Sequence, residues 1–81
     1  MNAILIHDKV RTDYRIYVGS VLRYLTRNGI VQNFGGKGSI YIKSRREALD
    51  ILKSKYHTVL IEKYHDNYYT EERYQCHERK K

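Results

Sequence analysis

The chain has 81 residues, a net charge of +7, no proline and one cysteine, Cys76. This length allows one domain with a small core, and a lone cysteine excludes an intrachain disulfide, which favours a reducing compartment. Met1 to His7 contains no basic leader, and its apolar run is too short for a signal peptide or a membrane span. We therefore expect a cytoplasmic protein that does not associate with a membrane.

The positive charge is unevenly distributed. Residues 1–64 contain twelve Lys and Arg against five Asp and Glu, whereas residues 65–81 contain four of each. We interpret residues 1–64 as a single basic α+β domain and residues 65–81 as a polar, Tyr-rich C-terminal extension or tail. A basic domain suggests a polyanionic partner, because contact with phosphates releases counterions. The alternative is that the charge serves only solubility.

The first half of the chain predicts a strand and a long helix. Ala3 to His7 is short, apolar and Ile-rich, as in a buried strand. Thr12 or Asp13 can cap a helix that continues to about Asn28, where Asn28 and Gly29 supply a left-handed stop. The helix is predicted from apolar residues at the i, i+3, i+4, i+7 spacing of a buried face. These residues are Val18, Val21, Leu22 and Leu25.

The second half predicts a hairpin, a helix and a last strand. Residues 30–34 and 39–43 form the expected hairpin, with a glycine-rich turn between them. Ser44 and Glu47 form a capping box for a helix to about Lys55. Residues 57–64 contain a β-branched apolar run typical of a strand. From His65 onwards, the sequence is compatible with a short helix or with a flexible tail, and it does not decide between them.

This order predicts a ferredoxin-like βαββαβ fold, an α+β four-stranded antiparallel sheet with two helices on one face. The alternation of side chains in a strand then places Ile40 and Ile42 beneath the helices. The same alternation places Ser39, Tyr41 and Lys43 on the open face of the sheet.

The segment Lys37 to Ile42 resembles the third-strand signature of RNA-recognition-motif domains. Lys37, Gly38, Tyr41 and Ile42 match that signature, and the two residues between Gly38 and Tyr41 depart from it. The resemblance implies that single-stranded bases stack on Tyr41 while Lys37 and Lys43 contact phosphates. Gly36 and Gly38 would offer backbone N–H groups to a phosphate.

Residues 21–42 also resemble the recognition helix and wing of winged-helix DNA-binding regulators. This alternative places Arg23 and Arg27 near the major groove and Lys37 over the DNA backbone. The stretch before this helix is too short for the two further helices of such a domain, so this fold ranks second. The residues that fit are Val21, Leu22, Leu25, Gly29, Ile30, Gly36 and Gly38.

The sequence offers few groups for catalysis. Asp8 after the first strand resembles the strand-end aspartate of small ferredoxin-fold CRISPR adaptation subunits, which implies a metal-dependent nuclease as a further alternative. A single carboxylate is a poor metal site, and Asp8 also suits a turn. Cys76 and His77 lack the paired spacing of a zinc site. We therefore expect no cofactor, no metal and no enzymatic activity.

Together these observations predict a small basic protein that binds RNA or DNA. Its composition is reminiscent of regulatory or accessory proteins of viruses and mobile elements. Nine tyrosines suggest the alternative of a protein-binding inhibitor or adaptor acting on a host complex, and a homodimer would suit so short a chain. The predicted nucleic-acid contacts are Lys37, Tyr41, Lys43, Gly36, Gly38, Arg23 and Arg27.

Overall fold

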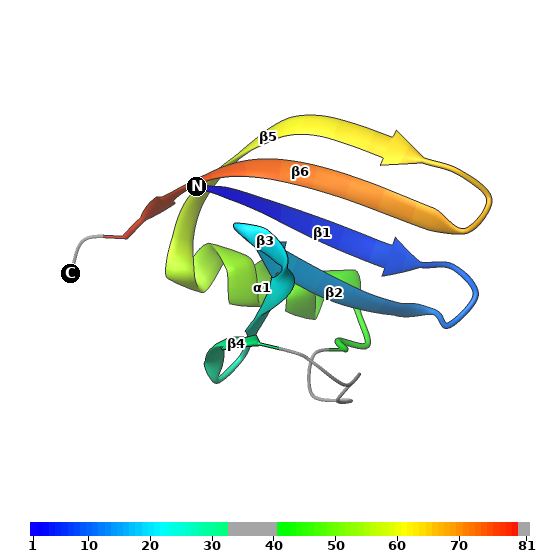
Figure 1. Cartoon of the computed structure of the whole chain (residues 1–81), viewed down its shortest axis with the longest axis horizontal. Helices are drawn as coiled ribbons and strands as arrows, with labels where there is room; N and C mark the ends of the chain where they lie inside the picture. Colours follow the sequence, from blue (N-terminus) through cyan, green and yellow to red (C-terminus); the bar gives the residue numbers. More distant parts are fainter. Residues whose placement is uncertain (33–40, 80–81) are drawn as a thin grey trace.

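The computed structural model describes residues 1–32 and 41–79 (Figure 1). In this part of the chain, six strands form one antiparallel sheet in the order β4-β3-β2-β1-β6-β5, and one helix lies between β4 and β5 in sequence. The elements are β1 (Asn2–Asp8), β2 (Asp13–Val18), β3 (Ser20–Thr26), β4 (Gly29–Gln32), α1 (Arg45–Lys55), β5 (Tyr56–His65) and β6 (Tyr69–Glu78).

The predicted ferredoxin-like fold is wrong, and so is the winged-helix alternative. Residues 13–26, which were expected to lie in a helix, form the hairpin of β2 and β3 instead. Gly19 makes the turn between these strands with a φ of 78°, a left-handed conformation that glycine adopts without strain. Ile16 and Val18 are buried while Arg15 and Tyr17 are half-buried, so the side chains follow the two-residue period of a strand.

Three predicted elements are confirmed. The first strand forms as β1, and the strand predicted over residues 57–64 forms as β5. Ser44 is the N-cap of α1, as predicted: the backbone N–H of Glu47 donates to Ser44 Oγ at 3.1 Å, while the Glu47 carboxylate accepts a hydrogen bond from Arg27. Such a cap satisfies one of the N–H groups that the first helical turn leaves without a partner.

The C-terminal region and the predicted hairpin differ from expectation. Residues 69–78 form neither a helix nor a flexible tail but β6, which pairs with β1 on one side and β5 on the other. Of the predicted hairpin, residues 29–32 form β4 against β3. Residues 33–40, including Ser39 and Ile40, lie outside the described part. Ile42 makes only an isolated bridge to Tyr14, so no strand holds Tyr41 and Lys43 on an open face.

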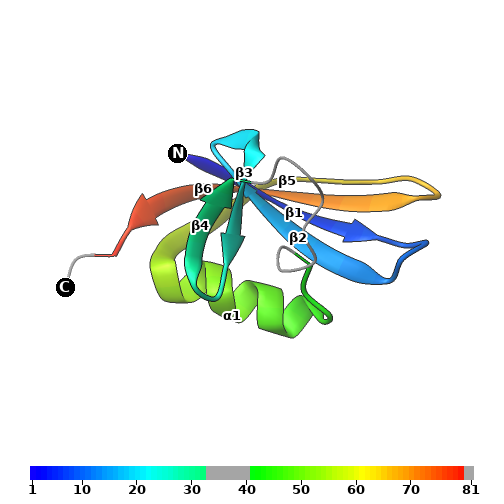
Figure 2. The same cartoon turned by 60° about the horizontal axis from the view of Figure 1, so that its bottom comes forward.

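The core lies between α1 and one face of the sheet, and in the described part of the chain the other face carries no helix (Figures 1 and 2). The helix buries Ala48, Ile51 and Leu52 against apolar side chains of five strands. Ile42 joins this cluster, which confirms its predicted position beneath a helix. The strand residues of the cluster are Ala3, Leu5, Ile16, Val18, Leu25, Tyr56, Tyr74 and Cys76.

One buried carboxylate ties α1 to the sheet. Glu72 on β6 is 4% exposed and accepts hydrogen bonds from Nε and Nη2 of Arg45 at 3.0 and 2.6 Å. Tyr74 Oη donates to the same carboxylate at 2.8 Å. The Arg45 guanidinium lowers the pKa of Glu72, while burial raises the pKa of Tyr74 to about 12. The ionised form of Glu72 is therefore stabilised by its partners.

Candidate nucleic-acid interface

Two of the predicted contact residues line one hollow at the edge of the sheet. Tyr41 and Lys43 come from the segment before α1, and Arg11, Thr12 and Asp13 come from the turn between β1 and β2 and the start of β2. The hollow has a volume of about 480 Å³. It brings one aromatic ring and two cationic side chains together from segments about thirty residues apart in sequence.

Backbone hydrogen bonds fix the segment that carries Tyr41 and Lys43. The N–H of Ile42 donates to the carbonyl of Tyr14, and the N–H of Tyr14 donates to the carbonyl of Ile42, both at 2.7 Å. The buried side chain of Ile42 points into the core. Because neighbouring residues of an extended segment alternate sides, Tyr41 and Lys43 are directed away from that core.

The other side of the hollow is formed by the turn between β1 and β2, which Asp8 stabilises. Its carboxylate accepts hydrogen bonds from the N–H groups of Val10 and Arg11, each at 3.0 Å. Thr12 closes the turn with a φ of 63°, and its N–H donates to the carbonyl of Asp8 at 2.7 Å. Asp8 is therefore a turn-forming residue, the second of the two roles that the sequence left open.

Arg11 lies over the Tyr41 ring, with 4.0 Å between the guanidinium carbon and the ring centroid. Arg11 Nε also donates to Asp13 Oδ2 at 3.0 Å, and this hydrogen bond raises the pKa of the guanidinium. Lys43 is exposed on the same hollow. The site thus combines a cation–π pair, one carboxylate and an exposed ammonium group with no ion-pair partner among the described residues.

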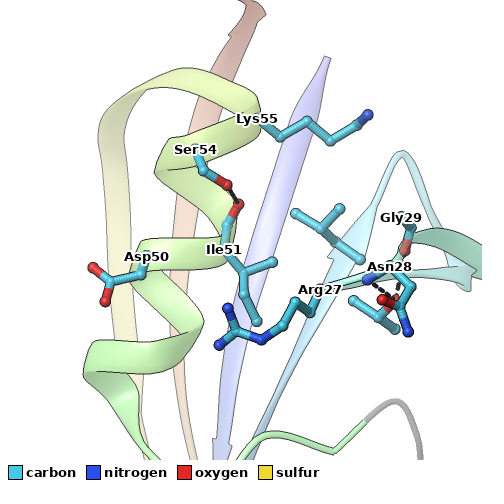
Figure 3. Close-up of a pocket in the computed structure, with 9 residues that line it drawn as sticks. Arg27, Asn28, Gly29, Asp50, Ile51, Ser54 and Lys55 are labelled. Carbon is cyan, nitrogen blue, oxygen red and sulfur yellow. Dashed lines mark hydrogen bonds between the residues drawn. The ribbon is translucent and has the colours of Figure 1, made fainter.

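Arg27 lies in a second hollow of about 500 Å³ between the β3–β4 turn and α1 (Figure 3). Figure 3 shows the Arg27 side chain extending toward Ile51 of the helix. Arg27 Nη2 donates to Glu47 Oε1 at 3.0 Å in an exposed ion pair. Lys55, Asn28 and Asp50 also line the hollow.

Arg23 and Arg27 do not lie on a helix, so the recognition helix that the winged-helix alternative required is absent from this segment. Arg23 lies on β3, opposite Gln32, and Arg27 follows the end of that strand. Neither residue lines the hollow that holds Tyr41 and Lys43. Lys37, Gly36 and Gly38 lie outside the described residues, and their predicted contacts stay predictions.

The sequence interpretation missed Arg11 and assigned the wrong residues to the open face of the sheet. On that face, the Tyr17 and Tyr24 rings lie 4.9 Å apart, and Arg15 lies 5.7 Å from the Tyr17 ring. Burial raises the pKa of Tyr17. The alternation of polar and apolar residues along β2 was the signal that could have revealed this face, but the helical spacing of the valines and leucines obscured it.

The described residues contain no group of three His, Cys, Asp or Glu side chains that could hold a metal ion. Asp8 is occupied by the turn, and Cys76 is buried beneath α1 with its pKa raised by burial. Within the described chain, α1 is also too short and too polar to cross a membrane.

Comparisons with protein-family models, with curated proteins and with solved structures found no match to this chain.

Proposed function

We propose that this protein binds single-stranded nucleic acid through Arg11, Tyr41 and Lys43. The observation that supports the proposal most directly is the cation–π contact of Arg11 with Tyr41, both of which line the same hollow as Lys43. Aromatic rings and guanidinium planes stack on unpaired bases, and lysine ammonium groups contact phosphates. The site therefore offers a stacking surface for the base of a nucleotide and a cationic group for its phosphate.

The charge of the whole molecule supports the same partner. The net charge of +7 attracts a polyanion over long range, while the hollow supplies short-range contacts. Asp13 neutralises part of the charge on Arg11, so among the described residues Lys43 is the cation of the site without an ion-pair partner. We expect Lys43 to contribute mainly salt-dependent affinity and Tyr41 to contribute stacking.

Fluorescence anisotropy with labelled single-stranded RNA, single-stranded DNA and duplex DNA tests this proposal. We expect Tyr41→Leu to weaken single-strand binding by about 5- to 150-fold, since stacking on one aromatic ring contributes ~1–3 kcal/mol per base. Lys43→Ala should lower the slope of log affinity against log salt by about 0.7, the value for one phosphate contact with a single strand.

Lys53→Ala is the matched charge control. Lys53 is also an exposed lysine, but it lies in the last turn of α1, and its side chain does not line the hollow. Equal losses in the Lys43 and Lys53 variants would show nonspecific attraction by the whole molecule and contradict this site. Absence of micromolar binding to all three probes at low salt would overturn the function itself.

A protein-binding inhibitor or adaptor is the second candidate function. Tyr64, Tyr68 and Tyr69 cluster at the turn between β5 and β6 and are 53%, 62% and 38% exposed. Exposed tyrosines are enriched at protein interfaces, because each ring buries a large area at low entropic cost. This candidate predicts that the anisotropy experiment detects no nucleic-acid binding.

A further inference from the structure

The open face of the sheet, opposite α1, carries side chains in rows that cross its strands (Figure 2). Residues directly opposite each other in an antiparallel pair point to the same face, so the pairing register defines each row. The first row runs from β5 to β3 and contains Glu62, Arg73, Ile4, Tyr17 and Tyr24. It therefore begins with a carboxylate on β5 and ends with two tyrosine rings on β2 and β3.

A second row lies beside the first and distributes its charge in the same way. It runs from β5 to β2 and contains Tyr64, Glu71, Ile6 and Arg15. Ile6 is 7% exposed although it is not part of the core beneath α1, so its neighbours on the open face cover it. Both rows thus place a carboxylate over β5 or β6 and place cationic or aromatic groups over β2 and β3.

Arg15 connects this half of the open face to the hollow of Tyr41. Its guanidinium carbon is 5.7 Å from the centroid of the Tyr17 ring, and the Tyr17 and Tyr24 rings are 4.9 Å apart. Burial opposes the charge of Arg15, but the nearby hydroxyl groups of Tyr17, Tyr41 and Tyr24 raise its pKa, so one cation faces three tyrosines. Arg11 lies over the Tyr41 ring. Arginine and tyrosine side chains therefore alternate from the β1–β2 turn to β3.

A second hollow of about 230 Å³ lies on this face at the end of β2. An aromatic side chain beside several hydrogen-bonding groups suits a single base with its polar edge. The two hollows lie at opposite ends of β2, whose six residues span about 20 Å at about 3.3 Å per residue. A ligand that fills both must therefore be a chain and not one nucleotide. The second hollow is lined by Asn2, Ile4, Tyr17, Gly19, Ser20 and Arg73.

We propose that Arg15, Tyr17 and Tyr24 bind further nucleotides of a single strand, one base of which stacks on Tyr41. This inference rests on the function proposed above. Tyr17 and Tyr24 offer a stacking surface beside the second hollow, and Arg15 contacts a phosphate between the two hollows. The carboxylates over β5 and β6 repel phosphates, so charge directs the strand along β2 and away from β5.

Fluorescence anisotropy with labelled oligodeoxythymidylates of about 2 to 16 nucleotides tests the inference. We expect the affinity of the wild type to rise with length and to level off once the strand reaches both hollows. Tyr24→Leu should weaken binding of the longest probes by about 5- to 150-fold and binding of the shortest probes by less. Tyr41→Leu should weaken binding at every length. Tyr24→Phe keeps the ring and should bind as the wild type does.

Arg15→Gln tests the phosphate contact, and Tyr64→Leu is the matched control for the tyrosines. Arg15→Gln should lower the slope of log affinity against log salt by about 0.7 for the longest probe. Tyr64 is 53% exposed on the same face but lies beyond the carboxylate of Glu71, so we expect no loss in its variant. Circular dichroism of each variant verifies that the sheet persists.

Two outcomes would refute this path while leaving the proposed function intact, provided that Tyr41→Leu still weakens binding. The first is an affinity that does not rise beyond the length that fills one hollow. The second is a loss in Tyr24→Leu that is equal at all lengths, or that Tyr64→Leu reproduces. If no probe binds at any length, the proposed function itself fails, and the inference that rests on it fails as well.

Discussion

Glu72 illustrates at the scale of one residue how a small sheet accommodates a charge in its interior. The carboxylate is 4% exposed, and three hydrogen bonds from Arg45 and Tyr74 replace its contacts with water. Arg45 remains half exposed, with 49% of its side chain accessible. The pair therefore costs less to bury than two enclosed charges, but Glu72 without Arg45 would be poorly solvated.

We predict that the Arg45–Glu72 pair makes the stability of the protein sensitive to acid. The pKa of Glu72 is lowered chiefly by Arg45, so its contribution is present above the ordinary glutamate pKa of about 4.3 and is lost as the pH falls through the lower folded-state pKa. At pH 7, Glu72→Gln should lower the unfolding free energy by about 1 kcal/mol, a value reduced by the exposure of Arg45.

Urea unfolding at pH 7, 5 and 3 measures this effect. The difference between wild type and Glu72→Gln should shrink as the pH falls to 3, because the unfolded chain then binds a proton at Glu72 that the folded chain, with its lowered pKa, binds only at lower pH. Glu78→Gln, which changes an exposed carboxylate on the same strand, serves as the control. A difference that stays constant from pH 7 to pH 3 would contradict the role given to the charge.

At the scale of elements, the hairpin of β2 and β3 shows why a helix was wrongly predicted from the sequence of this segment. Val18, Val21, Leu22 and Leu25 have helical spacing, yet Gly19 interrupts that segment at a position where a tight turn requires positive φ. The residues around it are rich in Tyr, Val and Ile, which favour strands. The spacing of the apolar residues favours a helix, whereas the composition favours strands. Pairing of β2 with β1 and of β3 with β4 stabilises the strand conformation.

The helix α1 was predictable because its signals are local. Ser44 accepts a hydrogen bond from the backbone N–H of Glu47 three residues later, and the apolar residues that follow have one consistent helical period. The strand β6 was not predictable on these grounds. Tyr69–Glu78 is polar and carries charges, and its strand conformation depends on two neighbours, β1 and β5, that the local pattern does not reveal.

We predict that Gly19→Ala destabilises the protein by about 1–2 kcal/mol, the cost of a left-handed conformation for a residue with a Cβ. An added Cβ would lie 3.5 Å from Arg23 Nη1, an ordinary contact, so φ and not crowding causes the loss. Thermal or urea unfolding measures it. Gly19→Asn should cost less, because asparagine tolerates positive φ, and equal stability of all three proteins would contradict a left-handed turn.

At the scale of the whole molecule, the candidate site was only partly accessible to sequence reasoning. Tyr41 and Lys43 were identified because they lie two residues apart, in or beside the segment that resembles the third-strand signature of RNA-recognition-motif domains. Arg11 could not be linked to them, since the bridge between Tyr14 and Ile42 that brings the two segments together leaves no local signal in the sequence. The same limit applies to the open face, whose rows of side chains depend on the strand order of the complete sheet.

The strand β6 brings the two ends of the chain together. It lies between β1 and β5 in the sheet, and its residue Gln75 pairs with Asn2 near the N-terminus. A chain truncated after His65 would lose Tyr74 and Cys76 from the core and leave β5 without a neighbour in the sheet. We expect that the truncated chain fails to fold cooperatively, because a domain of this size has only marginal stability.

Thermal unfolding followed by circular dichroism, compared with the full chain, tests this expectation. The full chain should give a single sigmoidal transition, and the truncated chain should give a broad signal without one. Retention of a sigmoidal transition after truncation would mean that residues 1–65 form a domain by themselves. That result would contradict the central place of β6 in the sheet, since removing an edge element is tolerated far better than removing a strand with two partners.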